Sequence, residues 1–188
     1  MNNTIRGVRI AVAALTIGAV TVVAGAAPAG ADSAPGNPDA AVYDGGTLDL
    51  SESWGGAAAC VELATTTECF DTEAELLAVH PELQAFAMPN KAGLGVVALV
   101  ADCSSSLRLY DGGSYTGSVL YLTTRQLVLN LSSYGFDNIT SSFKVGACAT
   151  SFFSLANAGG GTFSRSAFAQ SASMPAGFNN VLSSVYIG

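Results

Sequence analysis

Short apolar stretches, punctuated by glycine, asparagine and paired serines, follow one another through most of the chain beyond residue 42. This spacing is typical of a mainly β protein. Residues 47–50 predict one strand, and residues 57–63 and 68–70 can face each other as a hairpin. The uninterrupted apolar run at residues 96–100 predicts a fully buried strand.

One segment follows a helical pattern instead. Thr72 and Glu75 have the spacing of a capping box, in which two side chains satisfy the free N–H groups at the start of a helix. Apolar residues follow on one side until Pro81 interrupts the pattern. Residues 43–102 are therefore expected to form a small α+β region with one helix, either as a separate domain or as an extra layer on the remainder.

The C-terminal part of the chain contains an internal repeat. Residues 135–146 match residues 177–188 at a constant offset of 42 residues. The chain therefore contains two copies of a longer unit of about four short strands, the size of a Greek key. We predict two such repeats, residues 103–146 and 147–188, whose sheets pack face to face.

The first 31 residues have the three parts of a secretory signal peptide. Arg6 and Arg9 give a positive start, an apolar run follows, and residues 29–31 are the small residues that a signal peptidase accepts. A retained membrane anchor is the rival interpretation, but no charged cluster follows the apolar run. We expect a secreted protein with a flexible leader over residues 32–42.

Composition narrows the range of partners. The 188 residues include 7 basic and 14 acidic side chains, a net charge of −7, without a basic cluster. A nucleic-acid surface needs a basic stripe, and anionic membranes attract the same kind of surface. We therefore expect no binding to nucleic acid and, once the signal peptide is removed, none to membranes. We also expect a monomer.

Cysteines of exported proteins usually form disulfides, so we expect the four cysteines of this chain to pair. Three pairings are open to Cys60, Cys69, Cys103 and Cys148. The predicted hairpin favours Cys60 with Cys69, which leaves Cys103 with Cys148. Zinc is disfavoured because no CxxC spacing occurs and the chain has a single histidine.

Each repeat ends in the pattern N/D-N/D-x-x-S/T-S, at residues 137–142 and 179–184, and residues 110–117 fit Y/F-x-x-x-x-Y/F-x-G. Together these motifs resemble the microbial calcium-binding branch of the βγ-crystallin family. They also resemble the I36 group of peptidase inhibitors found among secreted actinobacterial proteins. The resemblance covers residues 103–188 and implies a βγ-crystallin-like sandwich of two Greek-key motifs, with two calcium ions where the motifs exchange loops.

The same resemblance implies a set of oxygen ligands drawn from both repeats. Calcium takes about 6–8 oxygens from carboxylates, amides, hydroxyls and backbone carbonyls. The implied ligands are the side chains of Asp137, Asn179, Ser141 and Ser183, the backbone carbonyls of Asn138, Ile139, Asn180 and Val181, and hairpin carbonyls near Asp111 and Ser154.

The chain departs from the family pattern in two places. Ala158 stands where the second hairpin should carry an aromatic residue, and Asn179 replaces a possible aspartate. With Asp137 as the one carboxylate among the motif positions, weak binding is expected, with dissociation constants of about 10⁻⁴–10⁻³ M. The alternative is that both motifs are structural corners, because Asn, Asp and Ser also form turns through their own hydrogen bonds.

The sequence predicts no catalytic constellation. His80 is the sole imidazole and lies at the predicted helix end, where its charge alone is favourable. We therefore predict a secreted, non-catalytic calcium-binding protein. The alternative function is peptidase inhibition, with residues 64–67, between Cys60 and Cys69, as one possible inhibitory loop that contacts a secreted peptidase.

Overall fold

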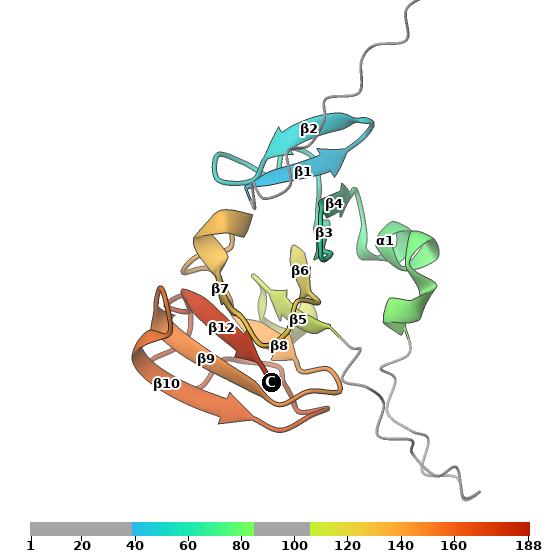
Figure 1. The fold of residues 1–188 in the computed structure, drawn as a ribbon. Coiled ribbons are helices and arrows are strands. Elements are labelled where there is room, and N and C mark those ends of the chain that lie inside the picture. The colour runs from blue at the N-terminus through green and yellow to red at the C-terminus, as the bar shows by residue number, and fades with distance from the viewer. Residues whose placement is uncertain (1–38, 85–105) are drawn as a thin grey trace, which may run out of the picture. The chain divides into compact units, whose positions relative to one another are not determined.

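The computed structural model describes residues 39–84 and 106–188 (Figure 1). The predicted signal peptide, most of the predicted leader, the predicted strand at residues 96–100 and Cys103 lie outside the described residues. The strands are β1 (Ala40–Tyr43), β2 (Gly46–Asp49), β3 (Ala59–Glu62), β4 (Thr67–Phe70), β5 (Leu107–Tyr110), β6 (Val119–Leu122), β7 (Val128–Asn130), β8 (Ser142–Lys144), β9 (Thr150–Leu155), β10 (Gly159–Arg165), β11 (Gln170–Ser171) and β12 (Ser184–Ile187). The helices are α1 (Glu73–Val79) and the 3₁₀ turns η1 (Pro81–Gln84), η2 (Gly113–Tyr115) and η3 (Leu131–Tyr134).

Strands β5 to β12 form two four-strand units that exchange their third strands. The first unit, β5 to β8, gives β7 to the sheet ordered β10-β9-β12-β7, and the second unit gives β11 to the sheet that contains β8, β5 and β6. The exchanged strands pair antiparallel, β7 with β12 and β11 with β8. The predicted mainly β sandwich of two Greek-key motifs is confirmed by this strand order.

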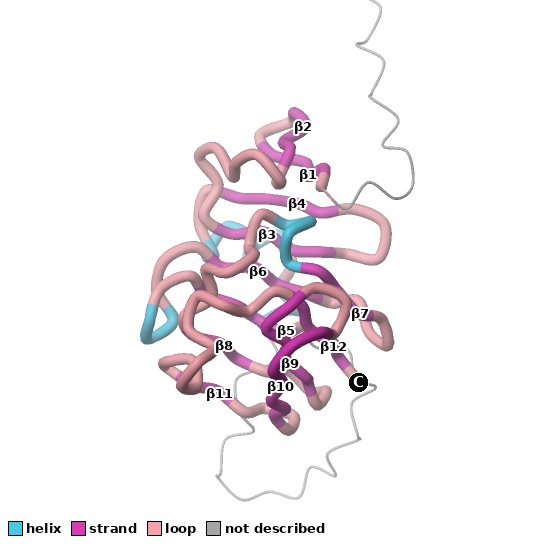
Figure 2. Tube along the Cα trace, turned by 90° about the vertical axis from the view of Figure 1, so that its left-hand side faces the viewer, coloured by secondary structure: helices cyan, strands magenta, loops and turns pink. Residues whose placement is uncertain are grey.

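The segment from Ala40 to Phe70, here named the N-terminal extension, continues one of these sheets. Strand β3 pairs in parallel with β6, and β4, β1 and β2 follow outward to give an eight-stranded sheet (Figure 2). The strands of this region therefore continue the sheet, whereas its helix, α1, lies on the outer face of the sheet. The first strand of the extension, β1, begins inside the segment expected to be a flexible leader, because it pairs with both β2 and β4.

The middle strands of the eight-stranded sheet are covered on both faces. Its inner face packs on the smaller sheet through a core that includes Leu109, Phe143 and Phe152, each with 0% exposure. Its outer face is covered by α1, whose Leu76 packs against Tyr110 and Tyr121. Burial on both faces explains why β3 (Ala-Cys-Val-Glu) and β6 (Val-Leu-Tyr-Leu) are mostly apolar, with Glu62 at the end of β3 as their one charged residue.

A carboxylate fastens the helix to this outer face. Glu73 Oε1 accepts hydrogen bonds from the hydroxyls of Tyr110 (3.1 Å) and Tyr121 (2.6 Å). Burial, together with the neighbouring carboxylate, raises the pKa of both tyrosine hydroxyls above their usual value. Both tyrosines therefore remain hydrogen-bond donors at neutral pH.

The predicted helix is confirmed, with both of its ends. Thr72 Oγ1 accepts a hydrogen bond from the N–H of Glu75 at 3.2 Å, as the capping spacing predicts. The helix ends at Val79, and Pro81 starts the 3₁₀ turn η1. His80 caps the helix, and its two ring nitrogens contact carboxylates of Glu68 and Glu82, each at 3.1 Å.

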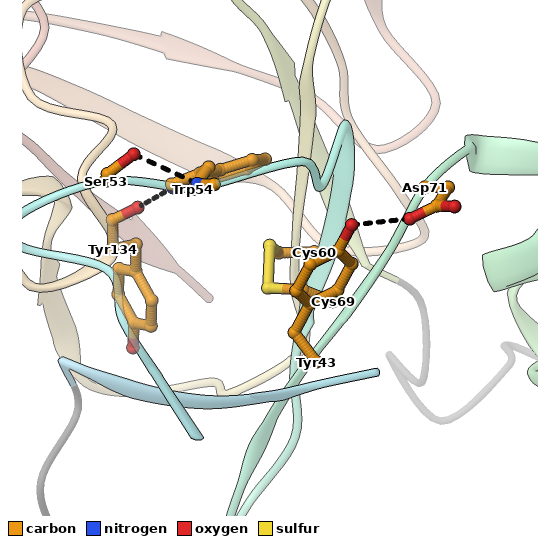
Figure 3. Close-up of a disulfide and its surroundings, with 8 residues drawn as sticks. Tyr43, Ser53, Trp54, Cys60, Cys69, Asp71 and Tyr134 are labelled. Carbon is orange, nitrogen blue, oxygen red and sulfur yellow. Dashed lines mark hydrogen bonds between the residues drawn. A yellow bond between two sulfur atoms is a disulfide. The ribbon is translucent and has the colours of Figure 1, made fainter. Parts of the chain in front are cut away.

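A disulfide joins Cys60 to Cys69 across the β3–β4 hairpin (Figure 3). The two cysteines are direct register partners in the antiparallel pair, so the predicted pairing is confirmed. Cys148 is buried in the sandwich core. Because Cys103 lies outside the described residues, its pairing with Cys148 stays a prediction.

The buried carboxylate of Glu62 joins the extension to the sandwich at the end of β3. It is 6% exposed and accepts hydrogen bonds from the N–H groups of Thr123 (2.8 Å) and Thr124 (2.9 Å). The Thr124 hydroxyl also donates to this carboxylate, and the Thr123 hydroxyl donates to the Glu62 carbonyl at 2.6 Å.

Removing this acceptor is expected to destabilise the fold. Glu62→Ala leaves the two backbone donors without a partner, so the free energy of unfolding should fall by about 2–4 kcal/mol in urea denaturation. Glu62→Gln keeps one acceptor oxygen and should lie between this variant and the wild type. The exposed Glu52→Ala is the control, and an equal loss in Glu52→Ala and Glu62→Ala would contradict the assignment.

Candidate functional site

The two repeat-ending motifs lie against each other. We name residues 137–142 the first corner and residues 179–184 the second corner. The N–H of Asn138 donates to the Leu182 carbonyl at 2.9 Å, and the N–H of Asn180 donates to the Thr140 carbonyl at 3.0 Å. Both asparagines adopt left-handed backbone angles, with φ of 60° and 55°. The corners are therefore joined by a reciprocal pair of backbone hydrogen bonds, as pseudo-twofold symmetry requires.

Side-chain oxygens from the two corners are paired in the same reciprocal way. The Ser141 hydroxyl donates to Asn180 Oδ1 at 3.1 Å, and the Ser183 hydroxyl donates to Asn138 Oδ1 at 3.3 Å. Each pair takes one oxygen from each repeat. Ligand oxygens around a calcium ion, each about 2.3–2.6 Å from the metal, also lie about 3 Å apart, so the spacing suits a shared cation.

Asp137 brings the one carboxylate of the two corners. Its Oδ2 accepts a hydrogen bond from the Asn138 side-chain amide at 2.9 Å. Its Oδ1 is buried and has no hydrogen-bond partner among the described residues. A buried carboxylate oxygen without a donor is costly, and a cation would satisfy it. Asn179, at the equivalent place in the second corner, is exposed and carries no charge.

The residues expected to offer backbone carbonyls form the tips of the corners. Ile139 is 37% exposed and Val181 is 39% exposed. Asn138 and Asn180 are exposed as well. An ion in solution can therefore reach both corners without the core opening.

Asp111 and Ser154 occupy equivalent places in the two hairpins, and their side chains are engaged there. Asp111 Oδ1 accepts from the N–H of Ser118, and Ser154 Oγ accepts from the N–H of Gly161, each at 2.8 Å. A β-carbon at Gly117 would lie 1.9 Å from Asp111 Oδ1, so the backbone can pass this close to the carboxylate only because residue 117 is glycine. Both side chains therefore brace their hairpins.

The second serine of each motif has a role that the sequence analysis missed. Ser142 Oγ, fully buried, donates to the Gly112 carbonyl (2.6 Å) and accepts from the N–H of Tyr115 (3.0 Å). Ser184 Oγ does the same with the Leu155 carbonyl (2.7 Å) and the N–H of Ala158 (3.1 Å). Alternation within a strand was the available signal, since adjacent serines at a strand start point to opposite sides.

These serines explain how the second hairpin survives without its aromatic residue. Tyr115 packs edge-on against Tyr110 with ring centroids 5.8 Å apart. Ala158 has no ring to contribute, yet it keeps the same left-handed backbone, with φ of 59° against 63° for Tyr115. The second hairpin has no such ring packing, and the hydrogen bonds of the buried Ser184 hydroxyl hold it in its bent conformation.

The described part of the chain gives little support to three alternative features: a metal site built on His, Cys, Asp and Glu, a catalytic role for His80, and a membrane-spanning helix. No group of three or more His, Cys, Asp or Glu side chains there could hold a metal. Both ring nitrogens of His80 contact carboxylates rather than a serine hydroxyl. No helix in residues 39–84 or 106–188 is long and apolar enough to cross a membrane. The corners are thus an oxygen-only donor set, which suits a hard cation.

No known protein family and no curated protein matches this chain. Among solved structures, a βγ-crystallin from Ciona intestinalis is 22% identical with a TM-score of 0.40, covering 44% of this chain and 99% of its own. A βγ-crystallin domain from Clostridium beijerinckii is 18% identical with a TM-score of 0.38, covering 44% and 95%. The N-terminal domain of protein S is 18% identical with a TM-score of 0.38, covering 44% and 94%. At these low values, the assignment of the double Greek key rests on strand order and register.

The two serines of the first corner should differ sharply when each is replaced. Ser142→Ala leaves a buried N–H and a buried carbonyl without their partner, so unfolding in urea should become about 1–3 kcal/mol easier. Ser141→Ala removes a more exposed hydroxyl and should change stability by less than about 0.5 kcal/mol. Equal losses in the two variants would contradict the division of roles.

Proposed function

We propose that this protein is a secreted, non-catalytic calcium-binding protein whose ions bind at the two corners. The observation that carries the proposal is the reciprocal pairing of Ser141 with Asn180 and of Ser183 with Asn138. The buried Asp137 oxygen without a donor supports it independently. Secretion is supported by the sequence of the first 31 residues.

The residues present fit calcium by their chemistry. Asp137, Ser141, Ser183 and Asn179 would supply side-chain oxygens, and the exposed tips at Ile139 and Val181 would supply carbonyls. The serine hydroxyls can rotate away from the asparagine amides, so that their lone pairs face a cation. Bound calcium would supply positive charge that links two loops of different repeats.

Binding of this kind stabilises the protein, because a ligand that recognises only the folded state shifts the unfolding equilibrium. The corners meet only when both repeats are folded and packed, since each oxygen pair takes one member from each repeat. One carboxylate among the corner residues implies a dissociation constant of about 10⁻⁴–10⁻³ M, as in other extracellular modules.

Calorimetric titration of the purified protein should therefore show saturable heat at millimolar calcium. Calcium at about ten times the dissociation constant should add roughly 1.4 kcal/mol to the free energy of unfolding for each filled site. Each such gain should raise the melting temperature by about 3–6 °C. The double variant Ser141→Ala with Ser183→Ala should bind at least about tenfold more weakly. Ser132→Ala, an exposed serine outside the corners, is the matched control. Absence of both heat and thermal shift at about 10 mM calcium would refute the proposal.

The β3–β4 turn supports a second candidate function, inhibition of a secreted peptidase. Ala64 and Thr65 are exposed, and the turn is closed by a hydrogen bond from the Leu63 N–H to the Thr66 carbonyl at 2.8 Å. The disulfide between Cys60 and Cys69 restrains its base. A loop held in one conformation loses little entropy when it binds a peptidase cleft.

Inhibition is testable with a panel of secreted serine and metallopeptidases. At equimolar protein, at least one peptidase should lose activity. The double variant Ala64→Pro with Thr65→Pro changes the conformation of the exposed turn, so it should leave that peptidase active. Full peptidase activity across the panel in the presence of the wild-type protein would discard this function while leaving calcium binding intact.

A further inference from the structure

The turns that lead into the two corners have the same sequence but different surroundings. Gly135-Phe136 precedes the first corner and Gly177-Phe178 the second, and both glycines have positive φ, 61° and 82°. A β-carbon at Gly135 would lie 2.2 Å from the Leu50 carbonyl oxygen, whereas one at Gly177 would meet nothing within 4 Å. The first turn is therefore pressed against the N-terminal extension, and the second is open on that side.

Trp54 forms the principal contact between the extension and the first turn. Its ring nitrogen donates to the Tyr134 carbonyl at 2.7 Å, as Figure 3 shows, and its ring lies 5.3 Å from that of Phe136. Phe136 is fully buried, and Asp137 follows it directly in the chain. The indole thus holds the backbone of Tyr134 before Gly135 and the side chain of Phe136 after it.

This contact lies next to the only corner with a carboxylate. The residues after Phe136 are Asp137, with its unpaired buried oxygen, and Asn138, whose amide oxygen receives the Ser183 hydroxyl. A coordinating side chain that is already held in place loses less conformational freedom when the ion binds. The corner next to Trp54 is therefore both the more charged and the more rigidly supported of the two.

We infer that the N-terminal extension belongs to the ion-binding device, with Trp54 as a positioning residue that makes the two corners unequal. This inference rests on the calcium-binding function proposed above. One site holds Asp137 and Asn138 together with Ser183 of the other repeat, and the other site holds Asn179 and Asn180 together with Ser141. The site at Asp137 and Asn138 fills at lower calcium than the site at Asn179 and Asn180. The extension sets the affinity of the first of these sites without contributing a ligand of its own.

The test follows calcium binding at each corner separately, by NMR titration of the backbone amides of Asn138 and Asn180 in the full chain. In the wild type, the Asn138 signal should saturate at lower calcium. Trp54→Phe keeps a ring against Phe136 but removes the donor, and should weaken binding at Asn138 by about three- to tenfold while Asn180 changes less than about twofold. Tyr43 lies elsewhere in the extension, and Tyr43→Phe removes its hydroxyl hydrogen bond to Asp71, so this variant should change neither signal.

Hydrogen exchange without calcium supplies a second readout. The Asn138 amide should exchange faster in Trp54→Phe than in the wild type, and the Asn180 amide should not. Gly135→Ala and Gly177→Ala form a matched pair that imposes the same backbone strain. Only Gly135→Ala also collides with Leu50, so its effect on Asn138 should exceed the effect of Gly177→Ala on Asn180.

The outcomes separate the inference from the function on which it rests. No calcium-dependent shift at either amide of the wild type would overturn the proposed function and the inference together. Calcium binding in the wild type, with both amides weakened equally or neither weakened in Trp54→Phe, would overturn the inference alone.

Discussion

The exchange of third strands between the two Greek keys is the constraint on which the rest of the structure depends. Because β7 pairs with β12 and β11 pairs with β8, neither repeat can complete a sheet without the other. The same exchange brings the two corners into contact and joins them by reciprocal backbone bonds. Any oxygen pair at the corners is therefore a property of the whole sandwich and not of one repeat.

Within this frame, polar groups have two distinct duties. Buried groups with complete hydrogen bonding, such as Ser142, Ser184 and Glu62, hold loops in place at positions closed to solvent. Groups at the exposed corners, such as Ser141, make a single hydrogen bond and keep further lone pairs. Of two adjacent serines, Ser142 therefore serves stability and Ser141 serves the proposed binding.

Local features were well predicted from the sequence, because their causes are local. The spacing of Thr72 and Glu75 defines a helix start, and the facing positions of Cys60 and Cys69 follow from one short hairpin. The repeat also predicted the sandwich, since a duplicated motif implies a duplicated unit. For the helix start and the hairpin, a few neighbouring residues contain the physical reason for the structure.

Long-range features were not predictable in this way. The parallel pairing of β3 with β6 joins strands almost sixty residues apart, and apolar periodicity says only that both are buried, not which strand lies next to which. The contact of Trp54 with the Tyr134 carbonyl is equally non-local. The bracing role of Asp111 was missed because the motif marks its hairpin without showing where its carboxylate points.

The parallel strand pair also changes which strand forms one edge of the larger sheet. In a bare double Greek key, β6 would be an open sheet edge with free N–H and C=O groups, ready to recruit a strand from another chain. Here β3 occupies that edge, and at the opposite end of the sheet β11 is just two residues long. The added strands move the outermost position at this end of the sheet from the apolar β6 to β2, a four-residue strand that carries Asp49. Trimming the chain back to the sandwich would therefore replace a short, charged edge strand with an apolar one.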